Sequence, residues 1–404
     1  MKHKADLILF ALSIIALATG IISYVRKKPP EPILELVFTQ WWQNEMEPGI
    51  LENLIIEFEE NNENVKIILK TLDYEETRKL LYGYFPDYND PDSGEIIKAM
   101  FPGDILAFDY LWLEDLYNNG VLDPGSSPLE PLIGFFYPFF YNINVLLEAG
   151  FSRPPKTRTE LLNYIRVVTG ENKNRYGIGF SLDENNSRGI FENIYPWFWG
   201  SSVSLLESGR PFNETFDFLT RLANENLIHP QSFFMDENEK HEAFINGQIA
   251  FMTASIRDIE YLKRRMGEDA FSISDIPRAD NYLGKPYFAA SDWSLGIFEG
   301  SAHKELAAGF ISFITEKKNL LAESANALTS DFSFLLPVFD DPVNFKAREL
   351  YIAGDLVNEK FLPRNIEQNA AERDFIFREE LFDLLEGKQS AAETAANVRQ
   401  RWGN

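Results

Sequence analysis

The sequence contains no cysteine, and this absence excludes disulfide bridges, thiolate zinc sites and cysteine nucleophiles. It also excludes the cysteine that a bacterial lipoprotein carries after its signal segment. Histidine is scarce as well, because only His3, His229, His241 and His303 occur and none of them pairs at metal-ligand spacing. We therefore expect neither a bound metal nor a cofactor.

Positive charge is also in short supply. Lysine and arginine number 38 against 62 aspartates and glutamates, which leaves a net charge of −24. A surface of this sign repels phosphate backbones, and no basic stripe interrupts it, so we expect no nucleic-acid partner. A hydrophobic content of 45% indicates a globular chain, and a length of 404 residues suits two lobes better than one core.

The N-terminus carries a long apolar run. Residues 7–25 are uncharged, and lysine or arginine residues flank them on both sides. A run of this length suffices for one membrane-spanning helix, but the small-x-small pattern at residues 16–18 also fits a cleavable signal. We expect residues 1–31 to form a signal or membrane-anchor segment. The remainder would then lie at the periplasmic or extracellular face of the cytoplasmic membrane, anchored or secreted.

Beyond this run, predicted strands and helices alternate. Residues 33–38, 65–72 and 104–109 are rich in branched and aromatic side chains, which is typical of strands. Between the first two, residues 49–61 repeat apolar side chains at helical spacing. The alternation predicts an α/β sheet with helical crossovers. Residues 133–142 are almost entirely apolar and aromatic, and we expect this stretch to cross between lobes.

Several stretches resemble one known family. LVFTQWW, followed by ILENLIIEFEENNENVKI, resembles its opening strand, aromatic turn and helix. The most specific stretch is FFYNINVLLEAGFSRPPKTRTELLNYI, and FINGQIAFMTAS and HKELAAGFISFIT follow in the family's order. From about residue 34 to 400, the chain resembles the extracellular solute-binding proteins of ABC importers, in the sugar-binding group that includes maltose-binding protein.

The resemblance implies an α/β fold with two lobes, the type II periplasmic-binding-protein fold, in which hinge strands join the lobes. Ligands of open α/β sheets bind outside the carboxyl ends of the strands, and the lobes close around them by a hinge motion. We expect the N-lobe to comprise residues 32–140 and 289–338, the C-lobe residues 141–288 and 339–404, and the hinge Tyr141 and Asn142.

The function implied by the resemblance is the capture of a mono- or oligosaccharide, which a monomeric protein delivers to ABC permease subunits without covalent chemistry. Residues 7–25 would hold it to the membrane if they are uncleaved. Three alternatives stay open: an anchored ligand sensor, a binding protein for a polyamine or another small solute, and a glycoside hydrolase. The last needs two cooperating carboxylates, and no acid pair with a supporting motif is found.

Aromatic rings cover the apolar faces of a sugar, while carboxylates, amides and arginines bind its hydroxyls. For the adjacent pair Trp41 and Trp42, strand alternation predicts opposite faces, so we assign Trp41 to the ligand and Trp42 to packing. Trp112 is also assigned to packing. The residues that we expect to contact ligand lie near the ends of predicted strands: Gln40, Trp41, Glu45, Asp109, Tyr110, Trp197, Trp199, Arg257, Asp292 and Trp293.

Overall fold

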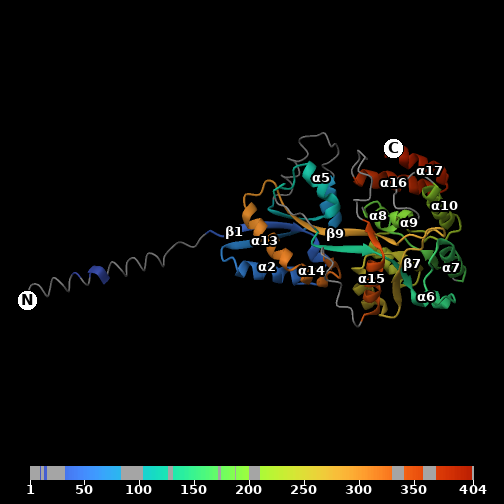
Figure 1. The fold of residues 1–404 in the computed structure, drawn as a ribbon, viewed down its shortest axis with the longest axis horizontal. Helices are drawn as coiled ribbons and strands as arrows, with labels where there is room; N and C mark the ends of the chain where they lie inside the picture. Colours follow the sequence, from blue (N-terminus) through green and yellow to red (C-terminus); the bar gives the residue numbers. More distant parts are fainter. Residues whose placement is uncertain are drawn as a thin grey trace, which may run out of the picture.

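The structure is a computed structural model that describes residues 10, 13–15, 32–82, 103–125, 131–171, 174–186, 188–199, 210–329, 341–357 and 370–402. These residues form two lobes that lie side by side, each built around its own β-sheet (Figure 1). The apolar run at residues 7–25 lies almost wholly outside the described residues. Within them, no helix is long and apolar enough to cross a membrane.

The N-lobe is built on a mixed sheet of seven strands in the order β10-β4-β9-β3-β1-β2, with β11 paired to β9. Strands β1, β2 and β3 are parallel, whereas β9 runs antiparallel to both β3 and β4. The strands are β1 (Leu34–Gln40), β2 (Val65–Thr71), β3 (Ile105–Asp109), β4 (Ile133–Tyr137), β9 (Tyr287–Ile297), β10 (Leu328–Thr329) and β11 (Asp355–Val357).

Helices lie above and below this sheet in Figure 1, with α5 on one side and α2 and α14 on the other. Helix α2 forms where the sequence repeats apolar residues at helical spacing, and it buries Leu51, Leu54, Ile55 and Phe58. The helices of the N-lobe are α2 (Ile50–Glu60), α3 (Tyr74–Tyr82), α5 (Leu113–Asn118), α13 (Lys304–Glu316) and α14 (Lys318–Ser324), with short 3-10 turns at Trp42–Asn44 and Tyr110–Trp112.

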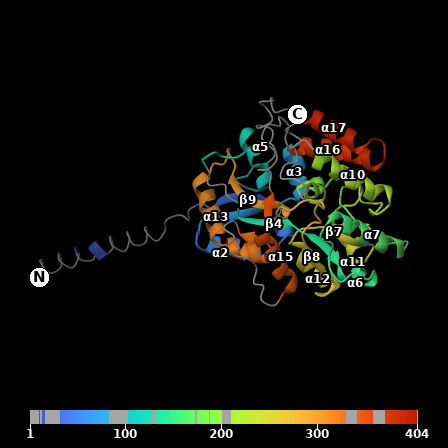
Figure 2. The same ribbon diagram turned by 45° about the vertical axis from the view of Figure 1, so that its right-hand side comes forward.

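The C-lobe is built on a smaller sheet of four strands in the order β6-β7-β5-β8. These strands are β5 (Phe139–Asn142), β6 (Tyr176–Ile178), β7 (Ile249–Thr253) and β8 (Phe271–Ser274). Its helices are α6 (Ile143–Glu148), α7 (Arg158–Glu171), α8 (Gly189–Asn193), α9 (Tyr195–Trp199), α10 (Arg210–Asn224), α11 (Glu237–Ile245), α12 (Asp258–Met266), α15 (Pro342–Ala353), α16 (Ala370–Leu385) and α17 (Ala391–Arg401). Helices α10, α16 and α17 pack together at one end (Figure 2).

Between residues 131 and 297, the described chain passes from one lobe to the other twice. Strand β4 belongs to the large sheet and β5 to the small one, so the chain passes between the sheets at Pro138. Strand β9 returns the chain to the N-lobe, and its first residues pair with β11. The predicted hinge residues Tyr141 and Asn142 lie inside β5, a few residues beyond this passage.

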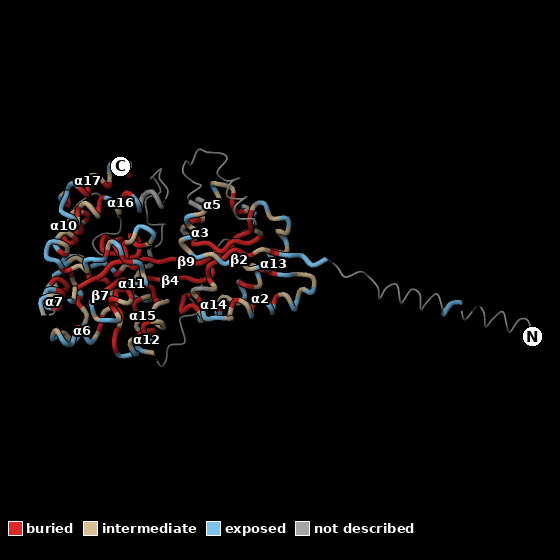
Figure 3. Tube along the Cα trace, turned by 180° about the vertical axis from the view of Figure 1, so that it is seen from behind, coloured by how far each residue is buried: buried red, intermediate tan, exposed pale blue. Residues whose placement is uncertain are grey.

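Buried residues follow the central strands of both lobes, while the outer faces of the helices are exposed (Figure 3). Strands β3, β4 and β7 are buried along their whole length, which accounts for their nearly uninterrupted apolar sequences. The two sheets therefore form rigid supports on both sides of the space between the lobes.

Candidate functional site

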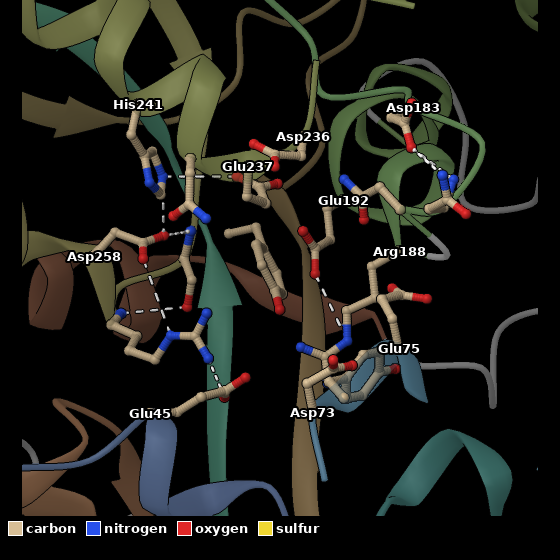
Figure 4. Close-up of a pocket in the computed structure, with 17 residues that line it drawn as sticks. Glu45, Asp73, Glu75, Asp183, Arg188, Glu192, Asp236, Glu237, His241 and Asp258 are labelled. Carbon is tan, nitrogen blue, oxygen red and sulfur yellow. Dashed lines mark hydrogen bonds and ion pairs between the residues drawn. The ribbon is translucent and has the colours of Figure 1, made fainter. Parts of the chain in front are cut away.

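A cavity of about 630 Å³ lies between the two lobes. Its size falls in the range of small-molecule sites in proteins. The N-lobe contributes Glu45 and the start of α3, and the C-lobe contributes most of the remaining wall (Figure 4). The lining residues are Glu45, Asp73, Tyr74, Glu75, Tyr137, Asp183, Asn185, Asn186, Arg188, Glu192, Asp236, Glu237, Asn238, His241, Ser255, Arg257 and Asp258.

The lining is predominantly acidic. Eight carboxylates face two arginines, Arg188 and Arg257, among the described lining residues. Both arginines come from the C-lobe. The eight acids are Glu45, Asp73, Glu75, Asp183, Glu192, Asp236, Glu237 and Asp258.

The C-lobe wall rests on a buried lysine. Lys240 is fully buried on α11, and its ammonium donates to the Asn193 side chain at 3.0 Å, to Glu237 at 2.9 Å and to the Thr253 carbonyl at 2.7 Å. Helix α11 begins here because Asp236 caps it and forms a reciprocal capping box with Glu239. The lysine thereby joins α8, α11 and β7 at one wall of the cavity.

His241 lies between two carboxylates of this wall. Its Nε2 is 3.6 Å from Glu237 and 3.5 Å from Asp258 (Figure 4). Burial would raise the pKa of the Asp258 carboxyl, but the neighbouring His241 and Arg257 side chains hold that pKa at about 2. Lys240 and His241 likewise outweigh burial at Glu237 and lower its pKa. Both carboxylates therefore stay charged at neutral pH.

The pKa of Glu192 is shifted in the opposite direction. It is 4% exposed, and burial together with the negative charge of Glu237 raises its pKa to about 8. Arg188 opposes this rise only in part, since its Nε lies 3.9 Å from the carboxylate. Beside it, burial also raises the pKa of the Tyr137 hydroxyl, which shares a hydrogen bond of 2.9 Å with Ser291. The cavity thus holds one carboxyl group that is protonated at neutral pH.

Among the described residues, two ion pairs cross from one lobe to the other beside the cavity. Arg257 donates to the Glu45 carboxylate, and its side chain is 28% exposed. Arg188 donates to the Asp109 carboxylate at 2.7 Å, where the side chains are 12% and 0% exposed. Glu45, Asp109 and Arg257 were expected at the site, and the structure brings all three to the boundary between the lobes. Glu45 and Arg257 line the cavity, whereas Asp109 is buried behind it.

Trp41 does not face an open cleft. Its side chain is 1% exposed and packs against Tyr74, Trp112 and Trp293, with ring centroids 5.3, 5.5 and 6.3 Å away. The strand alternation from which Trp41 was assigned to the ligand does not extend to the tryptophans, because β1 ends at Gln40 and a 3-10 turn follows. Trp42 is packed as predicted, stacked on Trp293 at 5.2 Å. Trp112, 3% exposed, also packs as predicted.

The other predicted aromatic residues are also buried. Trp197 packs against Phe139 and Phe218 and donates its indole N–H to the Asn193 carbonyl, while Trp199 packs against Phe191 and Tyr195. Both lie on α9 in the C-lobe core. Trp293 is also fully buried.

The remaining expected residues also lie outside the cavity lining. Gln40 is fully buried; its amide donates to Thr71 at 2.8 Å, and its carbonyl accepts from the Gln43 backbone at 2.9 Å. Tyr110 and Asp292 are partly exposed and do not line the cavity.

Four residues line the cavity without having been predicted there from the sequence: Tyr74, Arg188, Glu192 and His241. Asp73 and Tyr74 follow the carboxyl end of β2, and the reasoning applied to Asp109 would have found them. Arg188 and Glu192 lie on or beside the short helix α8, whose position no motif indicates. Among the described residues, no group of three or more histidine, aspartate and glutamate side chains could hold a metal ion.

Residues 136–346 match the model of the bacterial extracellular solute-binding proteins. The chain belongs to this family. Members of this family are solute-binding proteins rather than enzymes, and they work outside the cytoplasm. The cavity between the two lobes agrees with a solute-binding role. No curated protein matches the sequence.

Solved structures of similar fold cover most of the chain. The GacH receptor of Streptomyces glaucescens, studied unliganded and with acarbose, matches with a TM-score of 0.69 at 14% identity over 93% of this chain and 100% of its own. Maltose-bound MalE3 of T. maritima has a TM-score of 0.69 at 15% identity, covering 91% and 98%. The sugar-binding protein MalE of Xanthomonas citri has a TM-score of 0.67 at 16% identity, covering 91% and 96%. These likenesses confirm the predicted two-lobed α/β fold of type II.

Proposed function

We propose that this protein is the extracytoplasmic solute-binding component of an ABC importer and that it captures a carbohydrate between its lobes for delivery to a permease. The observation that carries the proposal is the 630 Å³ cavity, to which both lobes contribute polar side chains. Two of the similar structures named above were solved with acarbose and with maltose. Residues 7–25 would anchor the protein at the outer face of the cytoplasmic membrane or direct its export.

The cavity lining suits a polyhydroxylated solute. Carboxylates and arginines can accept from and donate to hydroxyl groups, and such charge-assisted hydrogen bonds contribute about 1.5–3 kcal/mol each. Tyr137 adds an aromatic ring with a hydroxyl group to the lining. Glu45 and Arg257, which were expected to contact ligand, remain proposed contacts. In place of the buried tryptophans, we propose four lining residues as ligand contacts: Tyr137, Asp183, Asn186 and Asn238.

A thermal-shift screen followed by calorimetry tests the proposal. Maltose, maltotriose and other neutral oligosaccharides should raise the melting temperature in a saturable manner, because ligand that binds only the folded state stabilises it. Tyr137→Phe keeps the ring but removes the hydroxyl, so it should weaken binding. Tyr261→Phe is the matched control, because Tyr261 bonds Glu242 and Arg265 outside the cavity. The sugar should be recovered uncleaved after incubation.

The excess of carboxylates favours a second candidate, a polyamine or another amine-bearing solute. An ammonium group gains from carboxylates and from the face of a tyrosine ring. The same screen therefore includes spermidine. Stabilisation by spermidine with no response to any sugar would replace the carbohydrate by an amine and leave solute capture intact. If neither sugars nor spermidine stabilise the protein, the proposal that this cavity captures such a solute is contradicted.

A further inference from the structure

Arg378 on α16 contacts a segment that forms part of the cavity wall. Its guanidinium donates twice to the backbone carbonyl of Leu182, from Nε at 3.0 Å and from Nη2 at 2.9 Å. Hydrogen bonds from a charged donor are stronger than those from a neutral one, and two of them fix the position of the carbonyl. Arg378 itself does not line the cavity. The contact therefore joins a C-terminal helix to a segment 196 residues earlier in the chain.

The segment that this arginine contacts is the wall loop, residues 182–186. Three of its residues line the cavity: Asp183, Asn185 and Asn186. Leu182 begins the loop, with a buried side chain and a backbone N–H that donates to the Ser232 carbonyl at 2.9 Å. Its own carbonyl is the acceptor for the arginine. The wall loop is therefore held at the residue directly before the first lining residue.

The lining side chains of the wall loop are bonded to the nearby backbone. Asp183 accepts from the backbone N–H of Asn185 at 2.8 Å and from its side-chain amide at 2.9 Å. The amide of Asn186 donates to the Ser181 carbonyl at 2.9 Å. Lys79 of the N-lobe also donates to Asn185, at 2.8 Å. A shift of the loop backbone would therefore move the polar groups that face the cavity.

Helix α16 supports the arginine firmly. Phe377, the preceding residue, is fully buried and stacks on Phe216 and Trp402, with ring centroids 5.7 and 5.8 Å away. Further along the helix, the Glu380 carboxylate accepts from the Arg401 guanidinium of α17 at 2.9 Å. Close packing in a core leaves little freedom for the backbone. The guanidinium therefore extends to the wall loop from a fixed helix.

We propose that Arg378 is a positioning residue of the solute site, because its guanidinium holds the wall loop where Asp183 and Asn186 meet the solute. The inference rests on the proposed function of the cavity, and it adds a helix that influences affinity without contributing to the lining. Binding groups act best when supporting hydrogen bonds hold them within about 0.5 Å of the productive geometry. Loss of the guanidinium should therefore weaken solute binding although no solute contact is removed.

Hydrogen exchange, measured without added solute, tests whether Arg378 holds the wall loop. Arg378→Met keeps an unbranched side chain but removes both donors, so the backbone amides of residues 182–186 should exchange several times faster. Arg399→Met is the matched control, because Arg399 lies on the neighbouring helix α17 and donates to the Ala395 carbonyl of its own helix at 2.9 Å. Its loop amides should exchange as in the wild type. Unchanged exchange of the loop amides in Arg378→Met would overturn the proposal.

Calorimetry with maltotriose and with spermidine tests whether the loop position affects binding. For the solute that the wild type binds, Arg378→Met should raise the dissociation constant about tenfold, as expected when one charge-assisted hydrogen bond is lost. Arg399→Met should leave it unchanged, and Arg378→Lys, which keeps a charged donor, should restore part of the loss. Faster exchange with an unchanged dissociation constant would overturn the positioning role. If the wild type binds neither probe, the proposed function fails, and the exchange result still decides whether Arg378 holds the loop.

A double-mutant cycle separates positioning from general destabilisation. Asp183→Asn keeps an oxygen for the bonds to Asn185 but removes the charge offered to the solute. Because Arg378 acts through this loop, Asp183→Asn should weaken binding less in the Arg378→Met background than in the wild type. Glu45→Gln, at the N-lobe side of the cavity, should have the same effect in both backgrounds. Additive effects of the Asp183 and Arg378 changes would contradict the proposal, and Arg378→Lys replaces Arg378→Met in every measurement if the latter does not fold.

Discussion

The two walls of the cavity are supported in different ways. Behind the N-lobe wall lie four packed tryptophans, Trp41, Trp42, Trp112 and Trp293. Behind the C-lobe wall lies Lys240 with its polar partners. Aromatic packing has no protonation state, whereas the geometry of a buried polar network depends on which groups are charged. The comparison indicates that the N-lobe wall keeps its shape over a wide pH range and that the C-lobe wall is sensitive to pH.

The walls differ in charge as well. The N-lobe contributes Glu45, Asp73 and Glu75, while both lining arginines belong to the C-lobe and pair with N-lobe carboxylates. This asymmetry gives the lobes complementary charge at their boundary, although the cavity as a whole is acidic. Complementary charge sets the orientation in which two surfaces meet. The arginines therefore help to fix the orientation in which the two lobes meet in this structure.

Removing the aromatic support should have the largest effect. Trp41→Ala and Trp42→Ala should each lower the free energy of unfolding by about 3–5 kcal/mol, because each leaves a cavity in the N-lobe core. Denaturant unfolding measures the loss. Phe234→Ala removes an aromatic ring that is 64% exposed and should change stability by less than about 0.5 kcal/mol. A Trp41→Ala protein as stable as the wild type would contradict the N-lobe half of the comparison.

Removing the polar support should have the next largest effect. Lys240→Met fills similar space but leaves Asn193, Glu237 and the Thr253 carbonyl without their donor, and we expect a loss of about 2–4 kcal/mol. Lys388→Met is the control, because that lysine is 56% exposed and pairs only at the surface. Equal stability of the two variants in denaturant unfolding would show that Lys240 does not support the wall.

The pH dependence of stability tests the C-lobe wall alone. The pKa of Glu192 is near its ordinary value of 4.5 in the unfolded chain and about 8 in the folded protein. Between these values the folded state holds a proton that the unfolded state releases, so stability falls as the pH rises from about 5 to 8. Glu192→Gln cannot ionise and should remove this fall, so the variant should be more stable than the wild type at pH 8.

The control for that measurement is Glu184→Gln, which changes an exposed glutamate of the same lobe. Its unfolding free energy, measured from pH 5 to 8, should follow the wild type. If Glu192→Gln also follows the wild type across this range, the C-lobe wall does not titrate as described.

Much of the fold could be predicted from the sequence because local patterns carry it. The apolar run at 104–109 became β3, and the helical spacing at 49–61 became α2. The residues of the cavity were harder to predict. A tryptophan next to a strand end can contact a solute or fill a core, and the short 3-10 turn that directs Trp41 inward has no pattern of its own.

The sequence by itself determined the strands, the helices and the excess of acid, since each depends on neighbouring residues or on composition. Only the tertiary structure decided which charges meet. Arg188 and Asp109 are 79 residues apart, and Arg257 and Glu45 are 212 apart. Such pairs form because the two sheets hold their strand ends and helix ends face to face, and no local pattern encodes that arrangement. The same packing excluded the tryptophans from the cavity and placed acids and arginines around it.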